Sequence, residues 1–350
     1  MFYLLPFGVG LLLTLIFTPL VKKLAIKLNI VDQPSPRKIH VQPVPLLGGT
    51  AIFFSFALTT LLFLFLGYVT DVKISATQIY AILTAGLILI FGGYLDDKFN
   101  LKPTRQFIFP LIAIFIVLLG GLKIQFITNP FGGVLEFSTT VGIILAGLWL
   151  LGMIYTTKFL DGLDGLVSGI TTISAIIIFI VSLYWDVPSS GTSTLALILA
   201  GCTLGFLYFN WHPAKIFLGE GGSVFCGFIL GVLAIISGSK IATALLIMGI
   251  PILDVLWVIV RRLWQNQSPT SPDRKHLHFR LLDIGMSQRQ AVLFLYFITG
   301  IFGLASLFLH TKGKILALAI LITIMIMLAI GLVAIYKSKR KNENIVNPNN

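Results

Sequence analysis

The chain has 350 residues, of which 57% are hydrophobic and only 11% are charged, and its mean hydropathy is +0.97. In such a chain, apolar runs of about 18 residues or more predict transmembrane helices. The net charge of +12 comes from 25 Lys and Arg against 13 Asp and Glu, and the basic residues are spread over several short connections. This spread argues against a nucleic-acid-binding protein, which would gather them in one patch, and indicates a polytopic membrane protein.

Eleven apolar segments are predicted to form transmembrane helices, which gives an all-α fold. The first has neither the basic region nor the small-residue cleavage site of a signal peptide, so we expect it to be retained. The segments are approximately 2–21, 47–69, 77–95, 106–122, 140–155, 166–185, 193–209, 223–238, 241–260, 290–309 and 315–336. We expect residues 1–336 to form a single transmembrane domain and the basic segment 337–350 to be a disordered tail.

Basic residues are concentrated on alternate connections between these segments. The other connections carry only Lys73, Lys123, Lys240, Lys312 and Lys314. Since cytoplasmic loops are enriched in Lys and Arg, this pattern predicts an external N-terminus and a cytoplasmic C-terminus in the cell membrane. The same orientation places most acidic residues on the cytoplasmic face, which is where we expect the chemistry.

Two short motifs supply the first candidates for a functional site. Asp96 and Asp97 end an apolar run in FGGYLDDKFNLKP, and adjacent carboxylates near lipid repel one another unless a cation or a phosphate-bound metal lies between them. Asp161 and Asp164 lie three residues apart in KFLDGLDGL, and each is followed by a glycine that lets a ligand or a neighbouring backbone approach. The alternative for one of this second pair is that it only caps the following helix.

Two further acids have distinctive positions. Glu220 belongs to the glycine-rich turn GEGGS that opens the eighth predicted segment, where backbone amides can cradle phosphate and a carboxylate can hold magnesium. Asp254 is the one acid well inside a predicted segment, so it either pairs with a base or lines the site.

Several basic and histidine residues have two interpretations each. Arg37, Lys38 and His40 lie on a proline-rich connection and either attract phosphate or only set the topology. The long connection before the tenth segment combines six basic residues with His276 and His278, which favours anion binding over zinc. The other histidines are expected to be ordinary loop residues and the cysteines small buried hydrophobes: His212, His310, Cys202 and Cys226.

Acids, bases and glycine turns on one membrane face indicate magnesium-assisted phosphoryl chemistry, in which a metal ion neutralises developing charge and positions both partners. The sequence contains no Walker-type lysine loop, which argues against transport driven by ATP hydrolysis. A polytopic carrier or lipid flippase is the competing hypothesis. It predicts acids near the midplane of several helices rather than at one face.

Four motifs, DDKFNLKP, KFLDGLDGL, KIFLGEGGS and DRKHLHFRLL, occur in this order on the predicted cytoplasmic loops. In this combination the chain resembles the polyprenyl-phosphate N-acetylhexosamine-1-phosphate transferase family, which includes phospho-N-acetylmuramoyl-pentapeptide-transferase. The resemblance implies that a sugar 1-phosphate, with N-acetylglucosamine 1-phosphate favoured, passes from a UDP-sugar to a polyprenyl phosphate such as undecaprenyl phosphate, with release of UMP. It also implies a magnesium cofactor, with Mn²⁺ as the alternative ion, and the first membrane step of cell-envelope glycan synthesis, for wall polymer or lipopolysaccharide.

The resemblance also implies roles for individual residues. Asp96, Asp97 and Asp161 are the expected catalytic residues, and Asp96 is expected to activate the lipid phosphate as a base or as a transient nucleophile. Glu220 and Asp161 are expected to hold the metal. The expected substrate-binding residues are Phe217 stacked on uracil, Asp164 on the base, Lys158 on the pyrophosphate, and Arg274, His276 and His278 on the sugar and the phosphates.

Three positions depart from the family pattern. Lys158 stands where an asparagine commonly helps to hold the metal, and an ammonium has no lone pair to offer, so either Asp161 supplies that ligand or Lys158 contacts the pyrophosphate. Glu220 replaces an aspartate, and Phe279 replaces a histidine frequent in the last motif. The last motif is closer to the group that uses simple UDP-N-acetylhexosamines than to the muropeptide-transferring branch. An inactive relative that acts as an assembly partner is a further alternative, and the sequence leaves a homodimer open.

Overall fold

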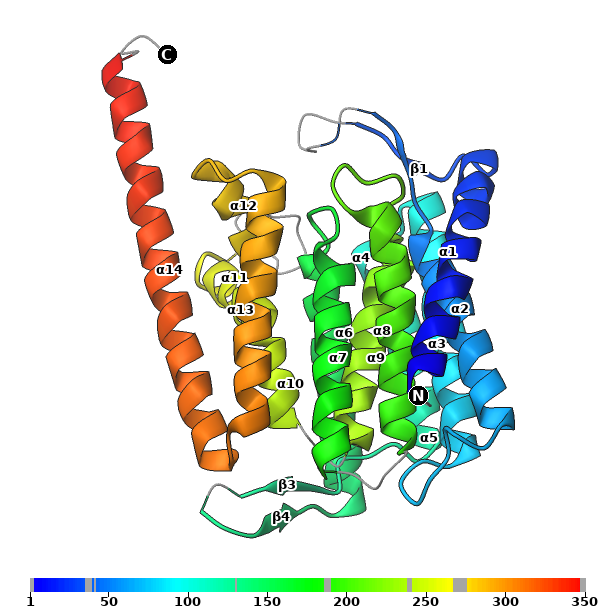
Figure 1. Ribbon diagram of the computed structural model, residues 1–350. Coiled ribbons are helices and arrows are strands. Elements are labelled where there is room, and N and C mark those ends of the chain that lie inside the picture. The colour runs from blue at the N-terminus through cyan, green and yellow to red at the C-terminus, as the bar shows by residue number, and fades with distance from the viewer. Residues whose placement is uncertain are drawn as a thin grey trace.

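The computed structural model describes residues 3–34, 40, 42–129, 131–185, 190–237, 241–266 and 276–346. These residues form helices and two small two-stranded antiparallel sheets (Figure 1). In chain order the elements are α1 (Leu4–Lys27), β1 (Val31–Asp32), β2 (Val44–Pro45), α2 (Gly48–Phe65), α3 (Ala76–Phe99), α4 (Pro103–Gln106), α5 (Ile108–Leu119), β3 (Phe126–Thr128), β4 (Val134–Glu136), α6 (Thr139–Leu160), α7 (Leu166–Trp185), α8 (Gly191–Asn210), α9 (Gly219–Ile236), α10 (Ile241–Ile247), α11 (Gly249–Trp264), α12 (Leu277–Asp283), α13 (Gln288–Phe308) and α14 (Thr311–Val346).

The helices account for all eleven predicted apolar segments, although not all as full spans. Within the described ranges, nine helices are long and apolar enough to cross a membrane, and the broken pair α10 and α11 makes a tenth if it is counted as one span. The segment predicted at 106–122 forms only a shorter apolar helix, Pro103–Leu119. These findings confirm a multi-pass, all-α membrane protein.

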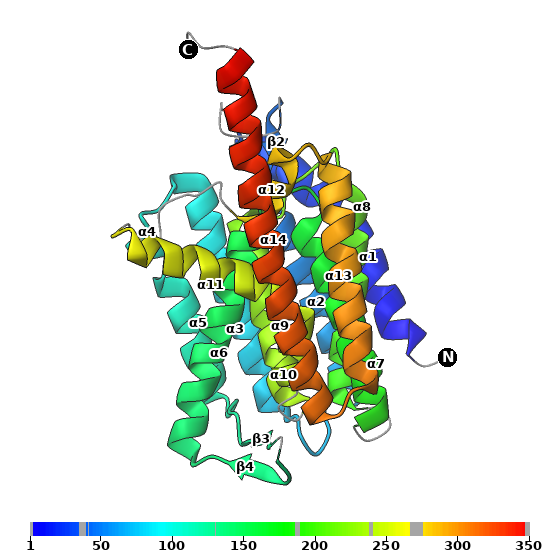
Figure 2. The ribbon, with the colours of Figure 1, turned by 90° about the vertical axis from the view of Figure 1, so that its left-hand side faces the viewer.

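The segment predicted as a straight span at 241–260 is instead bent by 78° between α10 and α11. The backbone explains the break. Pro251, in the first turn of α11, has no N–H to donate to the carbonyl of Ile247, so the hydrogen bonds of α10 cannot continue across this point. As a result α11 lies across the bundle rather than along it (Figure 2).

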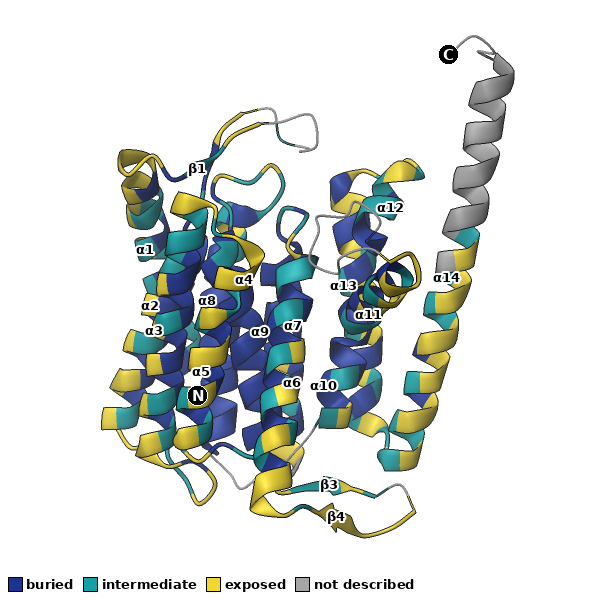
Figure 3. Ribbon diagram, turned by 180° about the vertical axis from the view of Figure 1, so that it is seen from behind, coloured by how far each residue is buried: buried dark blue, intermediate teal, exposed yellow. Residues whose placement is uncertain are grey.

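The core of the bundle is α9. In its membrane-spanning window 94% of the residues are buried, against 22% in α1 and 17% in α14. The helices α2, α3, α6 and α7 pack around α9, while α1 and α14 present exposed apolar side chains on the outside (Figure 3). This arrangement is expected where lipid covers the outer helices, because lipid solvates apolar side chains and leaves no reason to bury them.

Four glycines allow α9 to lie unusually close to two of its neighbours. A Cβ built on Gly93 of α3 would lie 2.1 Å from Cα of Gly221, and one built on Gly49 of α2 would lie 2.1 Å from Cα of Gly222. Such close backbone contact between helices requires residues without side chains. The turn GEGGS at the start of α9 is therefore fixed between α2 and α3.

The two ends of the bundle differ. The short sheet β1–β2, with Val31 paired to Pro45, lies at the end that also carries α12 and the C-terminus, whereas the hairpin β3–β4 lies at the opposite end (Figure 1). The last helix, α14, continues beyond the predicted end of the final segment through the basic residues to Val346. Lys, Arg and Glu are good helix formers, which accounts for this continuation.

Candidate active site

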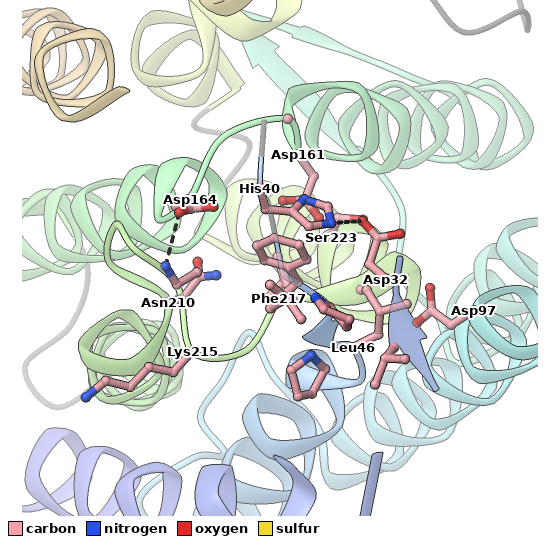
Figure 4. A pocket seen from close by; sticks show the side chains of 18 of the residues that line it. Asp32, His40, Leu46, Asp97, Asp161, Asp164, Asn210, Lys215, Phe217 and Ser223 are labelled. Atoms are coloured by element: carbon pink, nitrogen blue, oxygen red, sulfur yellow. Dashed lines mark hydrogen bonds and ion pairs between the residues drawn. The ribbon is translucent and has the colours of Figure 1, made fainter. Parts of the chain in front are cut away.

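A cavity of about 1330 Å³ opens at the end of the bundle that carries β1 and β2. It is formed by the β1–β2 connection, the last turn of α3, the α6–α7 loop and the α8–α9 connection, which are distant in sequence. Seven of the predicted site residues line it: Asp96, Asp97, Lys158, Asp161, Asp164, Phe217 and Glu220. In Figure 4, Phe217 lies near the centre, with Asp164 on one side of it and Asp97 on the other.

Asp97 is fixed by the N-terminus of α9. Its Oδ1 accepts a hydrogen bond of 3.1 Å from the backbone N–H of Glu220, so a carboxylate from α3 caps another helix. Gly219 makes this contact possible, because its φ is +75° and a Cβ there would lie 2.6 Å from Oδ2 of Asp97. Asp97 lines the cavity, and its Oδ2 accepts no hydrogen bond from the residues that the structure describes.

Asp96 is held more tightly than its neighbour. Its Oδ1 accepts from the backbone N–H of Leu101 at 2.8 Å, and Nε2 of Gln106 donates to both of its carboxylate oxygens at 3.0 Å. These bonds order the connection between α3 and α4. Gln106 was not among the predicted site residues, because a neutral side chain on a short helix gives no sequence signal.

Lys158 and Glu220, two of the three positions that depart from the family pattern, contact each other. The ammonium of Lys158, in the last turn of α6, forms an ion pair with Oε1 of Glu220, and it also donates to Oε1 of Gln106 at 2.8 Å. The two side chains are only 16% and 22% exposed. Charge-assisted bonds at partly buried positions are stronger than those on the surface, so this pair is a fixed feature of the cavity.

Asp161 follows the last residue of α6 and lines the cavity, to which its side chain is open. The protein that encloses the cavity still raises the pKa of Asp161 to about 8, mainly by desolvation, and the charges of Glu220, Asp97 and Asp164 add to the effect. Solvent in the cavity screens part of this repulsion. A carboxyl in such surroundings favours a proton or a cation beside it.

Asp164 forms a hydrogen bond with a histidine that the sequence analysis did not connect with it. Its Oδ2 lies 2.6 Å from Nδ1 of His212 and accepts from the backbone N–H of Ala214 at 3.1 Å. His212 was expected to be an ordinary loop histidine, and that interpretation was wrong. It lines the cavity from the α8–α9 connection, 48 residues away in sequence from Asp164. Only the packed fold brings these two loops together.

Asn210, which was also not among the predicted site residues, connects the same two loops by hydrogen bonds. It is buried, its Oδ1 accepts from Gly165 N–H at 3.1 Å and from Ser168 Oγ at 2.9 Å, and its Nδ2 donates to the carbonyl of Ile216 at 3.0 Å. The acid-bearing loop after α6 and the chain leading to Phe217 are thereby held together.

Phe217 and His40 form an aromatic edge at the cavity. Their rings lie 5.2 Å apart at 72°, and His40 Nε2 is 3.5 Å from Oδ2 of Asp32 (Figure 4). Phe217 is positioned by its backbone, which donates to the carbonyl of Pro45 and accepts from Gly48. Arg37 and Lys38 of the same connection lie outside the described residues.

His276 and His278 were predicted to contact the sugar. Both are buried, and neither is among the residues that line the cavity. Asp254 of α11 accepts from Leu277 N–H at 2.9 Å and lies 2.9 Å from Nδ1 of His276, so the alternative of pairing with a base is the one that the structure supports. Burial lowers the pKa of His278 to about 4, and its ring is neutral at physiological pH. Arg274 lies outside the described residues.

In the motifs KFLDGLDGL and GEGGS, Gly162, Gly221 and Gly222 allow close packing against neighbouring segments. A Cβ on Gly162 would lie 2.4 Å from Nε2 of His278, so this glycine lets the histidine approach the loop of Asp161 and Asp164. In GEGGS, Gly221 and Gly222 contact α3 and α2 as described above. The prediction that this turn exposes its amides to phosphate is not supported for these two glycines, because neighbouring backbones cover them.

Comparison with known proteins decides the family. The model of glycosyl transferase family 4 matches residues 79–238, which span α3 to α9 and carry the cavity residues from Asp96 to Glu220. The chain is 35% identical over 334 residues to the probable undecaprenyl-phosphate N-acetylglucosaminyl 1-phosphate transferase of Bacillus subtilis, a match that covers 90% of this chain and 87% of that protein. The chain belongs to glycosyl transferase family 4. The predicted resemblance is confirmed.

Two further relatives match this chain over similar lengths. The decaprenyl-phosphate N-acetylglucosaminephosphotransferase of Mycolicibacterium smegmatis is 34% identical, with 87% of this chain and 81% of that protein covered. The undecaprenyl-phosphate alpha-N-acetylglucosaminyl 1-phosphate transferase of Yersinia pestis is 31% identical, with 80% and 77% covered. The match to the family model ends before the motif DRKHLHFRLL, so this motif is outside the part of the chain that defines the family.

Proposed function

We propose that this protein transfers N-acetylglucosamine 1-phosphate from UDP-N-acetylglucosamine to undecaprenyl phosphate. The observation that carries the proposal is the convergence of Asp97, Asp161, Glu220 and Lys158 in one cavity that the half-buried ring of Phe217 also lines. The names of the three relatives support the sugar and the polyprenyl phosphate acceptor. They favour this reaction over the muropeptide-transferring branch.

In this reaction an oxygen of the lipid phosphate attacks the β-phosphorus of the UDP-sugar. A new P–O bond forms, the bond between that phosphorus and the bridging oxygen breaks, and UMP leaves with the bridging oxygen. The product is a lipid-linked pyrophosphate sugar. Because attacking and leaving groups are all anionic, positioning and charge neutralisation supply most of the catalysis.

The acid pair supplies the proton acceptor for the lipid phosphate. Asp96 was the predicted activating residue, but both of its oxygens accept hydrogen bonds from Gln106, whereas Asp97 lines the cavity and its Oδ2 accepts no hydrogen bond from the described residues. We therefore assign proton acceptance to Asp97 and the fixing of its position to α9. Asp96 orders the adjacent connection.

Magnesium fits this site in one particular way. Among the described residues no three His, Cys, Asp or Glu side chains lie close enough to form a complete metal cluster. Mg²⁺, however, usually binds through one or two carboxylates together with substrate phosphates. Asp161 and Glu220 are the carboxylates that would hold the ion, and Asp97 lies next to Glu220. When bound, the ion would neutralise charge on the diphosphate.

The nucleotide and the membrane define the remaining contacts. We assign the uracil ring to Phe217, with the Asp164–His212 pair in the same lining, because an aromatic ring on which a base can stack, together with hydrogen-bonding groups, suits a nucleobase. The C-terminal end of α14 lies at the same end of the bundle as the β1–β2 sheet, whose residues line the cavity (Figure 1). With the basic connections on that side, we place the cavity in the cytoplasm and the N-terminus outside the cell membrane.

A carrier or flippase is less well supported by the packing. Its ion path would need acids within the spans, and Asp254, the acid predicted to lie there, is fixed by His276 and the backbone of Leu277.

The proposed enzyme activity is tested by incubating purified protein with Mg²⁺, undecaprenyl phosphate and a panel of UDP-N-acetylhexosamines. We expect UMP release with UDP-N-acetylglucosamine, and no release with any of them would refute the proposal.

A further inference from the structure

Gln106 connects two residues of the cavity without lining the cavity itself. It is the last residue of α4, and its amide nitrogen donates to both oxygens of Asp96 and to the carbonyl of Leu101 at 3.0 Å. Its amide oxygen accepts from the Lys158 ammonium at 2.8 Å. A single neutral side chain therefore sets the position of an acid on α3 relative to a cation on α6.

The Lys158 ammonium is oriented by two acceptors that do different things. Glu220 Oε1 neutralises part of its charge, while Gln106 Oε1 accepts a hydrogen bond and adds no charge. An ammonium has three N–H donors. Among the described residues, Glu220 and Gln106 accept from two of them, which leaves one N–H of Lys158 for a ligand. Lys158 also lines the cavity, so this donor is within reach of a bound molecule.

The charge around Lys158 makes it the suitable contact for an anion. Asp96, Asp97, Asp161 and Glu220 line the same part of the cavity and repel a diphosphate. The cavity lining contains two further lysines, Lys22 and Lys215, and Lys215 lies on the Asp164 side of Phe217, away from Asp97 (Figure 4). Lys158 is the lining lysine that forms an ion pair with one of these acids, Glu220, so an anion bound beside the acids lies next to its charge.

We propose that Lys158 is a built-in cation that binds the diphosphate of a nucleoside diphosphate or its sugar ester, and that Gln106 is the positioning residue that aligns it with Asp96. The inference rests on the proposed function for the identity of the nucleotide. It adds a fixed protein cation to whatever divalent ion the site binds. Nucleotide binding consequently has a component that does not depend on metal.

Exchange of the two side chains tests the proposal directly. Because the Lys158 ammonium and the Gln106 amide oxygen are 2.8 Å apart, the double variant Gln106→Lys/Lys158→Gln places one ammonium and one amide at nearly the same point, but carried by the opposite helices. Lys158→Gln removes the cation. Gln106→Leu keeps the cation and removes only the hydrogen bond that aligns it. Lys98→Gln is the matched control, since Lys98 is an exposed lysine in the last turn of α3 that contacts Tyr94.

The measurement is UDP affinity by titration calorimetry in EDTA and in Mg²⁺, together with kcat and KM for UMP release. We expect Lys158→Gln to weaken UDP binding in EDTA about 10-fold or more, as for loss of a charge-assisted hydrogen bond. We expect Gln106→Leu to weaken it by a smaller factor and the exchange variant to return it to within about 3-fold of wild type. Lys98→Gln should bind as wild type.

Unchanged UDP affinity in Lys158→Gln, or an exchange variant no better than Lys158→Gln, would overturn the proposal. If Lys158→Gln does not fold, Gln106→Leu and the exchange variant decide, and wild-type affinity in Gln106→Leu would be contrary to the claim. The proposed function fails separately: a wild-type protein that binds UDP through Lys158 but releases no UMP from any UDP-N-acetylhexosamine would refute the reaction and leave the binding role intact.

Discussion

The contact between Gly93 and Gly221 links helix packing to the geometry of the cavity, and Gly93→Ala perturbs it with one methyl group. The new Cβ would lie 2.1 Å from Cα of Gly221, whereas carbon atoms in contact need about 3.5 Å. The helices α3 and α9 must therefore separate by roughly 1.4 Å, the difference between these distances. That displacement breaks the 3.1 Å hydrogen bond from Glu220 N–H to Asp97.

Overpacking of this kind costs about 1–3 kcal/mol, and a misplacement of about 1 Å at a reacting group can lower the rate about 10²-fold. We expect Gly93→Ala to lower the melting temperature in detergent and to lower kcat for UMP release by about that factor. Gly152→Ala is the control, because this exposed glycine of α6 has nothing within 4 Å of a built Cβ. A Gly93→Ala protein as stable and as active as Gly152→Ala would refute this account of the packing.

Four further outcomes are expected. Asp97→Asn, which removes the proposed proton acceptor, should reduce kcat for UMP release by about 10²–10⁴-fold with little change in UDP affinity, and wild-type kcat would contradict the assignment. Phe217→Leu should weaken UDP binding about 10-fold in calorimetry through lost base stacking, and unchanged affinity would remove uracil from this ring. Asp254→Asn should lower the free energy of unfolding by about 1.5–3 kcal/mol, seen as a lower melting temperature, because one hydrogen bond to a buried carboxylate is lost. Since the pKa of Asp161 is raised from 3.8 to about 8, the folded state binds that proton more tightly than the unfolded state, and the resulting stability is complete below pH 3.8 and lost as the pH rises to about 8. The melting temperature in EDTA should therefore fall over this range, and an Asp161→Asn variant with the same pH profile would show that another group is responsible.

Hydropathy was sufficient to locate the helices but not their course. All eleven predicted segments contain a helix, because runs of apolar residues bounded by polar connections have few other solutions in lipid. The bend between α10 and α11 was missed, although Gly249 and Pro251 mark it, since the apolar run continues through them. Hydropathy averages over a window and does not register one missing backbone donor.

The acids of the cavity were predictable because their cost near lipid sets them apart in the sequence. Asp97, Asp161 and Glu220 line one cavity, as the motifs indicated. The groups that orient these acids were not predictable. Gln106 and His212 have no distinctive sequence context, and their roles arise only when segments 52 and 48 residues apart come into contact.

The most direct test of the account is UMP release by purified wild-type protein, compared with Asp97→Asn, in the presence of Mg²⁺, UDP-N-acetylglucosamine and undecaprenyl phosphate. The account predicts that wild type forms UMP and lipid-linked N-acetylglucosamine pyrophosphate in equal amounts and that Asp97→Asn forms almost none. Absence of both products from folded wild-type protein, with every UDP-N-acetylhexosamine tried, would contradict it.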